Sequence, residues 1–170
     1  MTQTELSEQT IAARHRQLRR LVALAPVIFA AHVAEEAPGF VEWFNSHVSP
    51  GISSQSFWQV NLTALVITVI VSAVVWLGTS NASSVVAVAW LSFLMGANAL
   101  LHVAGAIVDR GYVPGLATAV LAYVPYYAVV LRRAKRSGLG AGTLLVTAVV
   151  SAIPMLIHGY RILFLGTRLF

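Results

Sequence analysis

The sequence contains no cysteine and few charged residues. Only 10% of its 170 residues are charged, whereas soluble domains average about 25%. The absence of cysteine excludes disulfide bonds, thiolate metal ligands and a cysteine nucleophile. The scarcity of charge accompanies 58% hydrophobic residues, which is more apolar surface than the core of one soluble domain would hide. These features favour an integral membrane protein.

Long apolar runs, separated by short connections rich in turn-forming residues, predict five membrane-spanning helices. A span requires about 20 mainly apolar residues. We expect spans at residues 21–40, 57–77, 84–108, 114–131 and 143–165, the first of them running as far as Phe44 at most. Residues 1–20 form a polar and basic segment, and residues 21–170 one transmembrane domain. The expected fold class is all-α.

The net charge of +5 comes largely from two basic clusters, at residues 14–20 and 132–136. Because nothing near them resembles a base-stacking surface, we expect no nucleic-acid partner and attribute them to topology and anionic lipid headgroups. Eight basic residues on one side against three on the other place the N-terminus inside and the C-terminus outside. We expect a multi-pass protein of a bacterial-type inner membrane, with membrane lipids, a lipophilic small molecule and a second copy of the chain as partners.

Polar residues inside the expected spans predict a functional site. An ionisable residue within a span costs about 2.5–3.5 kcal/mol and usually faces a bundle interior or a cavity. His32, Glu35 and Glu36 share one face of the first helix, since they are three and four residues apart. A helix rises about 1.5 Å per residue, so the depth of a residue in the membrane can be estimated from its position in a span. By this estimate, His102 in the third span and His158 in the fifth lie in the outer half of the bundle, as the two glutamates do. This common depth predicts one site.

Two adjacent buried carboxylates must take up protons or be neutralised by a cation. No lysine lies in any expected span, and imidazole with carboxylate suits a divalent ion such as zinc or iron. We therefore expect a metal ion held by His32, Glu36, His102 and His158, with Glu35 or Glu36 as catalytic acid or base. Side chains expected to support the ligands or contact substrate are Asn61, Asn98, Tyr126, Tyr160 and Arg161.

Simpler interpretations exist for the same residues. If the first helix ends near Glu35, because of the Pro38–Gly39 pair, both carboxylates lie among headgroups and have no chemical role. For His102 and His158, the simpler interpretation is a hydrogen bond between helices that tightens their packing. We read His15 and His47 as solvated.

The segment His32-Val33-Ala34-Glu35-Glu36 resembles the signature of an uncharacterised membrane family named for its H-x-x-E-E motif. Asn98 with His102, the stretch Tyr112 to Gly115 with Thr118, and the late His158 resemble other recurring positions of that family. The resemblance spans roughly residues 31–160. It marks the same residues as the physical reasoning but implies no particular activity.

Four functions fit these observations. The first is a membrane-embedded, metal-dependent enzyme that hydrolyses or oxidises a lipophilic, lipid-like or isoprenoid-like substrate. The second is a metal-free cyclase in which a protonated Glu35 or Glu36 donates a proton to an isoprenoid and aromatic faces stabilise carbocations. The third is a small proton- or ion-coupled transporter. The fourth, a scaffold without a site, conflicts with the shared depth of the polar residues.

Overall fold

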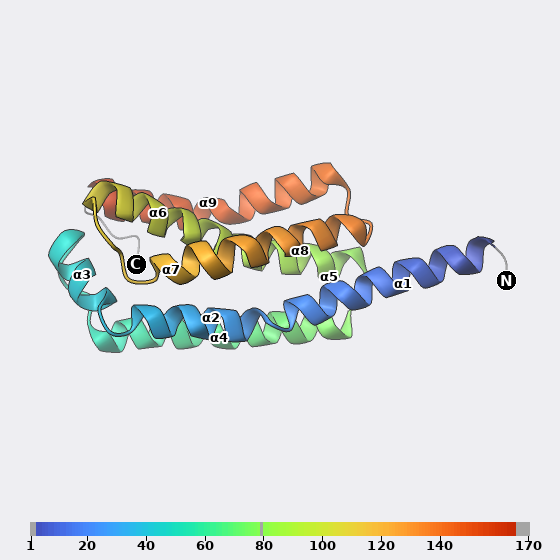
Figure 1. The fold of residues 1–170 in the computed structure, drawn as a ribbon, viewed down its shortest axis with the longest axis horizontal. Helices are drawn as coiled ribbons and strands as arrows, with labels where there is room; N and C mark the ends of the chain where they lie inside the picture. The colour runs from blue at the N-terminus through green and yellow to red at the C-terminus, as the bar shows by residue number, and fades with distance from the viewer. Residues whose placement is uncertain (1–2, 79, 166–170) are drawn as a thin grey trace.

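The computed structural model describes residues 3–78 and 80–165, and this part of the chain is all-helical, without strands (Figure 1). The α-helices are α1 (Gln3–Val22), α2 (Ala25–Glu36), α3 (Phe40–His47), α4 (Ser54–Leu77), α5 (Asn81–Leu91), α6 (Asn98–Asp109), α7 (Leu116–Thr118), α8 (Val124–Arg136) and α9 (Ala141–Leu165). Two π-helical segments, η1 (Ser92–Ala97) and η2 (Ala119–Tyr123), join α5 to α6 and α7 to α8. Apart from α3, the helices run along one long axis (Figure 1).

Four helical stretches of the described chain are long and apolar enough to cross a membrane. They are Ala12–Glu36, Ser54–Leu77, Asn81–Asp109 and Ala141–Leu165. The fourth expected span, 114–131, is not among them: it corresponds to α7, η2 and α8, which carry three tyrosines, a proline and a basic end. By length and composition, the described residues thus contain four candidate spans, which supports a membrane protein.

The helices around the first expected span have other bounds than residues 21–40. The polar N-terminal residues belong to α1, a continuous helix that joins α2 through a break at Ala23 and Leu24. Pro26 explains the break, because it has no N–H to donate to the carbonyl four residues earlier and its ring crowds that turn. At the other end, α2 stops at Glu36 rather than near Phe40, and the Gly39 N–H donates to the Glu36 carbonyl at 3.1 Å.

The short helix α3 turns across this end of the bundle, which we call the site end (Figure 1). Phe40 lies 5.7 Å from Phe44 and 5.8 Å from Phe57 between ring centroids, so α3 packs on the start of α4 through aromatic rings. The Trp43 indole N–H donates to Asp109 at 3.0 Å, which fastens α3 to the end of α6. Although α2 ends at Glu36, the chain therefore covers that end instead of exposing it.

The middle of the bundle is formed by α5 and η1. Leu91, Met95 and Ala97 are fully buried there, whereas large apolar side chains such as Val66 on α4 and Val149 on α9 are exposed. Outward-facing apolar surface of this kind is suited to lipid. The π-helical turns η1 and η2 immediately precede α6 and α8, and such turns occur often beside functional sites.

Candidate metal centre

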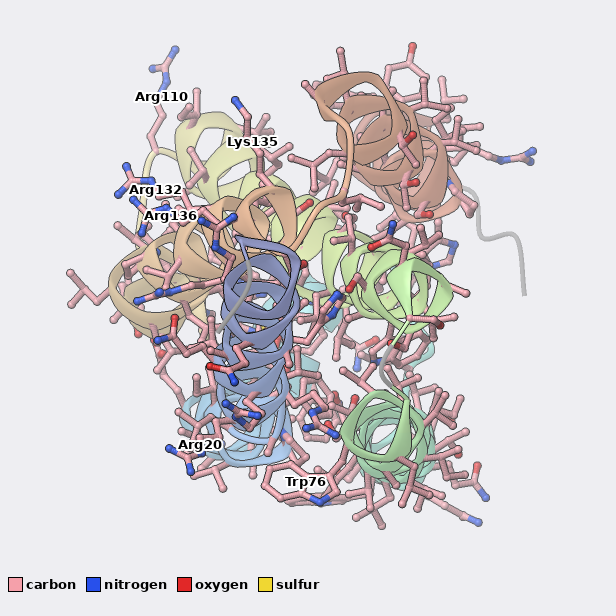
Figure 2. The ribbon with its side chains drawn as sticks, turned by 90° about the vertical axis from the view of Figure 1, so that its right-hand side faces the viewer. Arg20, Trp76, Arg110, Arg132, Lys135 and Arg136 are labelled. Carbon is pink, nitrogen blue, oxygen red and sulfur yellow. The ribbon has the colours of Figure 1, made fainter. Side chains whose placement is uncertain are left out.

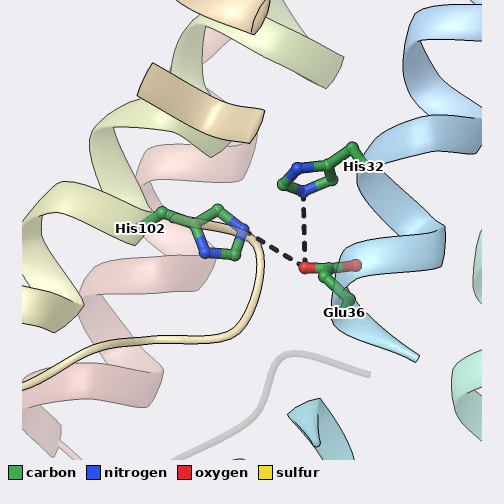
Figure 3. Close-up of side chains that lie close together, drawn as sticks. All are labelled: His32, Glu36 and His102. Atoms are coloured by element: carbon green, nitrogen blue, oxygen red, sulfur yellow. Dashed lines mark ion pairs between the residues drawn. The ribbon is translucent and has the colours of Figure 1, made fainter. Parts of the chain in front are cut away.

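Three polar side chains meet in the interior near the site end. His32 and Glu36 project from one face of α2, and His102 reaches them from α6 (Figure 3). His32 Nε2 lies 3.4 Å from Glu36 Oε1, and His102 Nε2 lies 3.2 Å from the same oxygen. His32 is 0% exposed, Glu36 5% and His102 6%, so water has almost no access to these groups.

One ring nitrogen of His32 is held by the hydroxyl of a threonine. His32 Nδ1 lies 2.7 Å from Thr118 Oγ1, and that hydroxyl donates to the Gly115 carbonyl at 3.3 Å. When the hydroxyl gives its single proton to the Gly115 carbonyl, it accepts from the Nδ1–H of His32. The neutral ring then presents a bare lone pair at Nε2, which has no hydrogen-bond partner among the described residues. That lone pair and the carboxylate oxygen of Glu36, both acceptors, face each other 3.4 Å apart.

Gly115 lies directly against the three side chains. A Cβ built at this residue would lie 2.6 Å from His102 Cε1 and 2.9 Å from both Glu36 Cγ and His32 Cε1. Gly115 also has a φ of +93°, a left-handed conformation that side chains other than glycine rarely adopt. Both the close approach and the backbone conformation therefore require glycine at this position.

Glu35 has a different environment from its neighbour Glu36. Its Oε1 accepts from the hydroxyl of Tyr112 and from the Ala117 N–H at 3.0 Å, and its Oε2 accepts from the Thr118 N–H at 2.7 Å. Ala117 and Thr118 lie in the first turn of α7, where backbone N–H groups have no partner within the helix. Glu35 is thus a helix cap supplied by another helix, and it fixes the segment 112–118 that carries Gly115 and Thr118.

A family model described as "Protein of unknown function with HXXEE motif" matches residues 23–130, more than half of the chain. The chain belongs to the HXXEE family. Comparisons with curated proteins and with solved structures found no match. The family match contains every residue of the cluster described above and ends before His158.

The two glutamates of the HXXEE motif make separate contacts in the structure. Glu36 faces the two imidazoles and Glu35 faces the first turn of α7. The spacing of the motif explains the first contact, because residues four apart on a helix are neighbours on one face. The second contact joins residues 83 positions apart, so no local pattern predicts it.

The three ligand atoms fit the dimensions of a metal centre. A tetrahedral ion with bonds of about 2.0–2.1 Å to nitrogen and oxygen has ligand atoms about 3.3 Å apart. The measured separations of 3.4 and 3.2 Å agree with this value, and all three ligand atoms lie within 4.8 Å of one another. Thr118 Oγ1 holds Nδ1 of His32, and a histidine that binds metal through one ring nitrogen usually has such a partner at the other.

Aromatic side chains enclose the cluster. The Tyr123 ring lies 4.3 Å from the His32 ring between centroids, and Phe40 lies 6.4 Å from His102. Tyr123 is fully buried, and its hydroxyl has no hydrogen-bond partner within residues 3–78 and 80–165. The cluster is therefore surrounded by apolar faces and one protic side chain.

The other expected site residues have surroundings of their own. His158 on α9 is not part of the group formed by His32, Glu36 and His102. The Asn61 amide donates to the Phe57 carbonyl in its own helix, and the Tyr126 hydroxyl donates to the Leu21 carbonyl. Tyr160 is 55% exposed and packs on Phe164. For Asn98 and Arg161, the buried atoms Oδ1 and Nε respectively have no hydrogen-bond partner among the described residues.

Two histidines that we read as solvated have clearer environments in the structure. His15 is only 9% exposed, so the expectation for it is wrong: it lies on the face of α1 that packs against the bundle. His47 is exposed, stacks on Trp43 with 5.9 Å between ring centroids, and lies 3.8 Å from the Asp109 carboxylate. Both are outside the metal-ligand cluster.

Proposed function

We propose that this chain is a membrane-embedded enzyme that holds a divalent metal ion with His32, Glu36 and His102 and acts on a lipophilic substrate. The observation that carries the proposal is the convergence of His32 Nε2 and His102 Nε2 on one buried carboxylate oxygen of Glu36, at 3.4 and 3.2 Å. A cation held between these atoms would give the His32 lone pair a partner and offset the buried negative charge of Glu36. No lysine or arginine of the described chain pairs with Glu36.

Zinc and iron are the ions that suit this ligand set. Two histidines with one glutamate hold zinc in several hydrolases, and two histidines with one carboxylate hold iron in oxygenases. A bound ion would supply either an activated water for hydrolysis or a site for oxygen chemistry. Three protein ligands leave room at the ion for a reacting group, which a purely structural zinc site does not.

The protein's own residues would exclude water and orient the ligands. Phe40 and Tyr123 cover the cluster, and the apolar exterior of the bundle gives a lipophilic molecule access through the bilayer. Both carboxylate oxygens of Glu35 already accept hydrogen bonds, three in all, and cap a helix. This argues against a role of Glu35 as a general base. The buried hydroxyl of Tyr123 is the protic group we assign to proton transfer at the site.

The decisive experiment is elemental analysis of the detergent-purified chain. We expect about one equivalent of zinc or iron, lost in His102→Ala and retained in His47→Ala, which removes an exposed histidine outside the cluster. Turnover of lipid or isoprenoid esters and hydrocarbons would then be tested with the metal-loaded protein. A metal-free protein whose stability does not respond to added zinc or iron would contradict the proposal and favour the acid-catalysed cyclase.

We also propose that the chain crosses the membrane five times, with the N-terminus inside and the C-terminus outside, in a bacterial-type inner membrane. The segment of α7, η2 and α8 runs beside the other long helices for most of the bundle's length, so it shares their layer (Figure 1). The test uses single cysteines, for which the cysteine-free chain is a clean background. Gly138→Cys should react only with a thiol reagent from inside, and Gly111→Cys only from outside; the opposite pattern, or equal labelling of both, would contradict this topology.

A further inference from the structure

The end of the bundle opposite the metal-ligand cluster carries a concentration of exposed basic side chains. They lie in the second half of α1 and the last turns of α8, and comprise Arg16, Arg20, Arg132, Lys135 and Arg136. Figure 2 looks at this end and shows Arg20, Arg132, Lys135 and Arg136 extending outward from the two helices. We call these five residues the basic face.

The two helices that form the basic face are fastened to each other. Arg14 donates to the Arg136 carbonyl at 3.3 Å, and Arg133 donates to the Gln17 side chain at 2.5 Å. These bonds use side chains of α1 and α8 that are not part of the basic face, so its own charged groups stay available. The face is therefore a preformed arrangement of two adjacent helices rather than two independent tails.

The charges of the basic face are uncompensated within the described residues. Arg16 with Arg20, and Arg132 with Arg136, are pairs four apart on one helix, a spacing at which like charges destabilise a helix. Ion pairs in the described part of the chain all involve histidines near the site end. Four of the six acidic residues (Glu35, Glu36, Glu42 and Asp109) belong to that end, and Glu5 and Glu8 lie at least two turns N-terminal of Arg16.

We propose that the basic face binds the phosphate groups of anionic phospholipids in the leaflet at this end of the bundle. Arginine matches phosphate through two parallel N–H donors, and phosphate would remove the repulsion within each arginine pair. The location favours lipid over a soluble polyanion, because apolar residues of a membrane-length helix end beside it. Leu77 is 82% exposed and Trp76 50% exposed at the end of α4, and the Arg19 side chain donates to the Trp76 carbonyl (Figure 2). This proposal is independent of the metal centre.

The test is native mass spectrometry of the full chain titrated with short-chain phosphatidylglycerol or phosphatidylcholine. A basic residue near a membrane surface contributes roughly fivefold to the affinity for anionic lipid. We expect at least about a fivefold preference for phosphatidylglycerol, falling as salt is raised. The quadruple variant Arg16→Gln, Arg20→Gln, Arg132→Gln and Arg136→Gln should bind the two lipids within about twofold of each other.

Two control variants keep the test decisive. Replacing the same four arginines by lysine retains the charge and should retain most of the preference, which separates loss of charge from loss of fold. Arg110→Asn removes an exposed arginine from the site end, with a residue that tolerates its φ of +54°, and should leave the preference unchanged. Equal binding of both lipids by the unmodified chain, an unaltered preference in the glutamine variant, or an equal loss in Arg110→Asn would each overturn the proposal. Binding of a soluble polyanion without any preference between lipids would do the same.

Discussion

Replacing Gly115 by alanine tests the proposed metal centre most directly. The added methyl carbon would lie 2.6 Å from His102 Cε1 and 2.9 Å from both Glu36 Cγ and His32 Cε1, while ordinary contacts begin at 3.4 Å. The three ligands must therefore move by at least 0.5–0.8 Å relative to residue 115. Bond lengths in metal sites hold to within about 0.2 Å, so displacements of this size disrupt all three bonds together.

The expected result is a loss of metal affinity of at least about 100-fold, at the upper end of what changes beside a metal ligand produce. The affinity would be measured by competition with a chelator of known strength, and the geometry by the absorption spectrum of the cobalt-substituted protein. The left-handed backbone adds a separate cost of about 1–2 kcal/mol in unfolding free energy, followed by thermal denaturation in detergent.

Two other glycines separate these effects. Gly138 has a φ of +111° but its nearest contact would be 3.7 Å, so Gly138→Ala should lose stability and keep its metal. Gly142 has nothing within 4 Å, so Gly142→Ala should change neither property. If Gly115→Ala bound metal with the affinity and spectrum of the unmodified chain, the assignment of His32, Glu36 and His102 as ligands would be refuted.

Further predictions concern the groups around the cluster. Glu36→Gln should abolish metal binding. Glu35→Gln should keep one equivalent of metal and lower the unfolding free energy by about 1–2 kcal/mol, because hydrogen bonds are lost. Equal metal loss in both variants would contradict the separate roles of the two glutamates. Thr118→Val should weaken metal binding about 10–100-fold and shift the NMR signals of His32 away from those of the Nδ1–H tautomer. Thr118→Ser, which keeps the hydroxyl, should restore both properties. Unchanged signals in the valine variant would disprove the tautomer assignment. The hydrogen bond to the Glu35 carboxylate raises the pKa of Tyr112, so the phenol of Tyr112 should titrate above pH 10, measured as the absorbance change that Tyr112→Phe lacks. The stabilisation from this hydrogen bond should be present below that pH and disappear as Tyr112 ionises. A midpoint below pH 10 would contradict the bond.

The sequence predicts the helical fold, the motif and the partnership of α2 with His102, because apolar length and helical spacing are local properties. The alternative in which the first helix ends near Glu35, at Pro38 and Gly39, gives the end of α2 correctly, but it does not predict that Glu36 is buried there. A count of residues per turn assumes a regular helix, and η1 lies between the start of α5 and His102. The depth of a residue along a helix does not say which way its side chain points, so it could not show that the group of possible ligands leaves out His158.

The roles of Glu35, Thr118 and Gly115 depend on contacts between distant parts of the chain. Sequence reasoning treated the two glutamates as an interchangeable pair of acids, since both lie in the same turn of one helix. Only the placement of the first turn of α7 against α2 distinguishes them. The resemblance to the family marked Thr118 and the stretch from Tyr112 to Gly115. The physical reasons for these residues, which are the contact of Thr118 with His32 and the lack of room for a Cβ at Gly115, are visible only in the folded structure.

The end of α2 and the beginning of α7 also give the paired glutamates opposite electrical surroundings. A helix carries roughly half a positive charge at its N-terminus and half a negative charge at its C-terminus. Glu35 lies against the positive pole of the helix that begins at Leu116, so its negative charge is stabilised by the dipole of that helix. Glu36 lies at the negative pole of its own helix, where the dipole repels a carboxylate and attracts a cation. One residue step along the chain thus separates an anion that completes the fold from an anion that faces two imidazoles and, in our proposal, a metal ion.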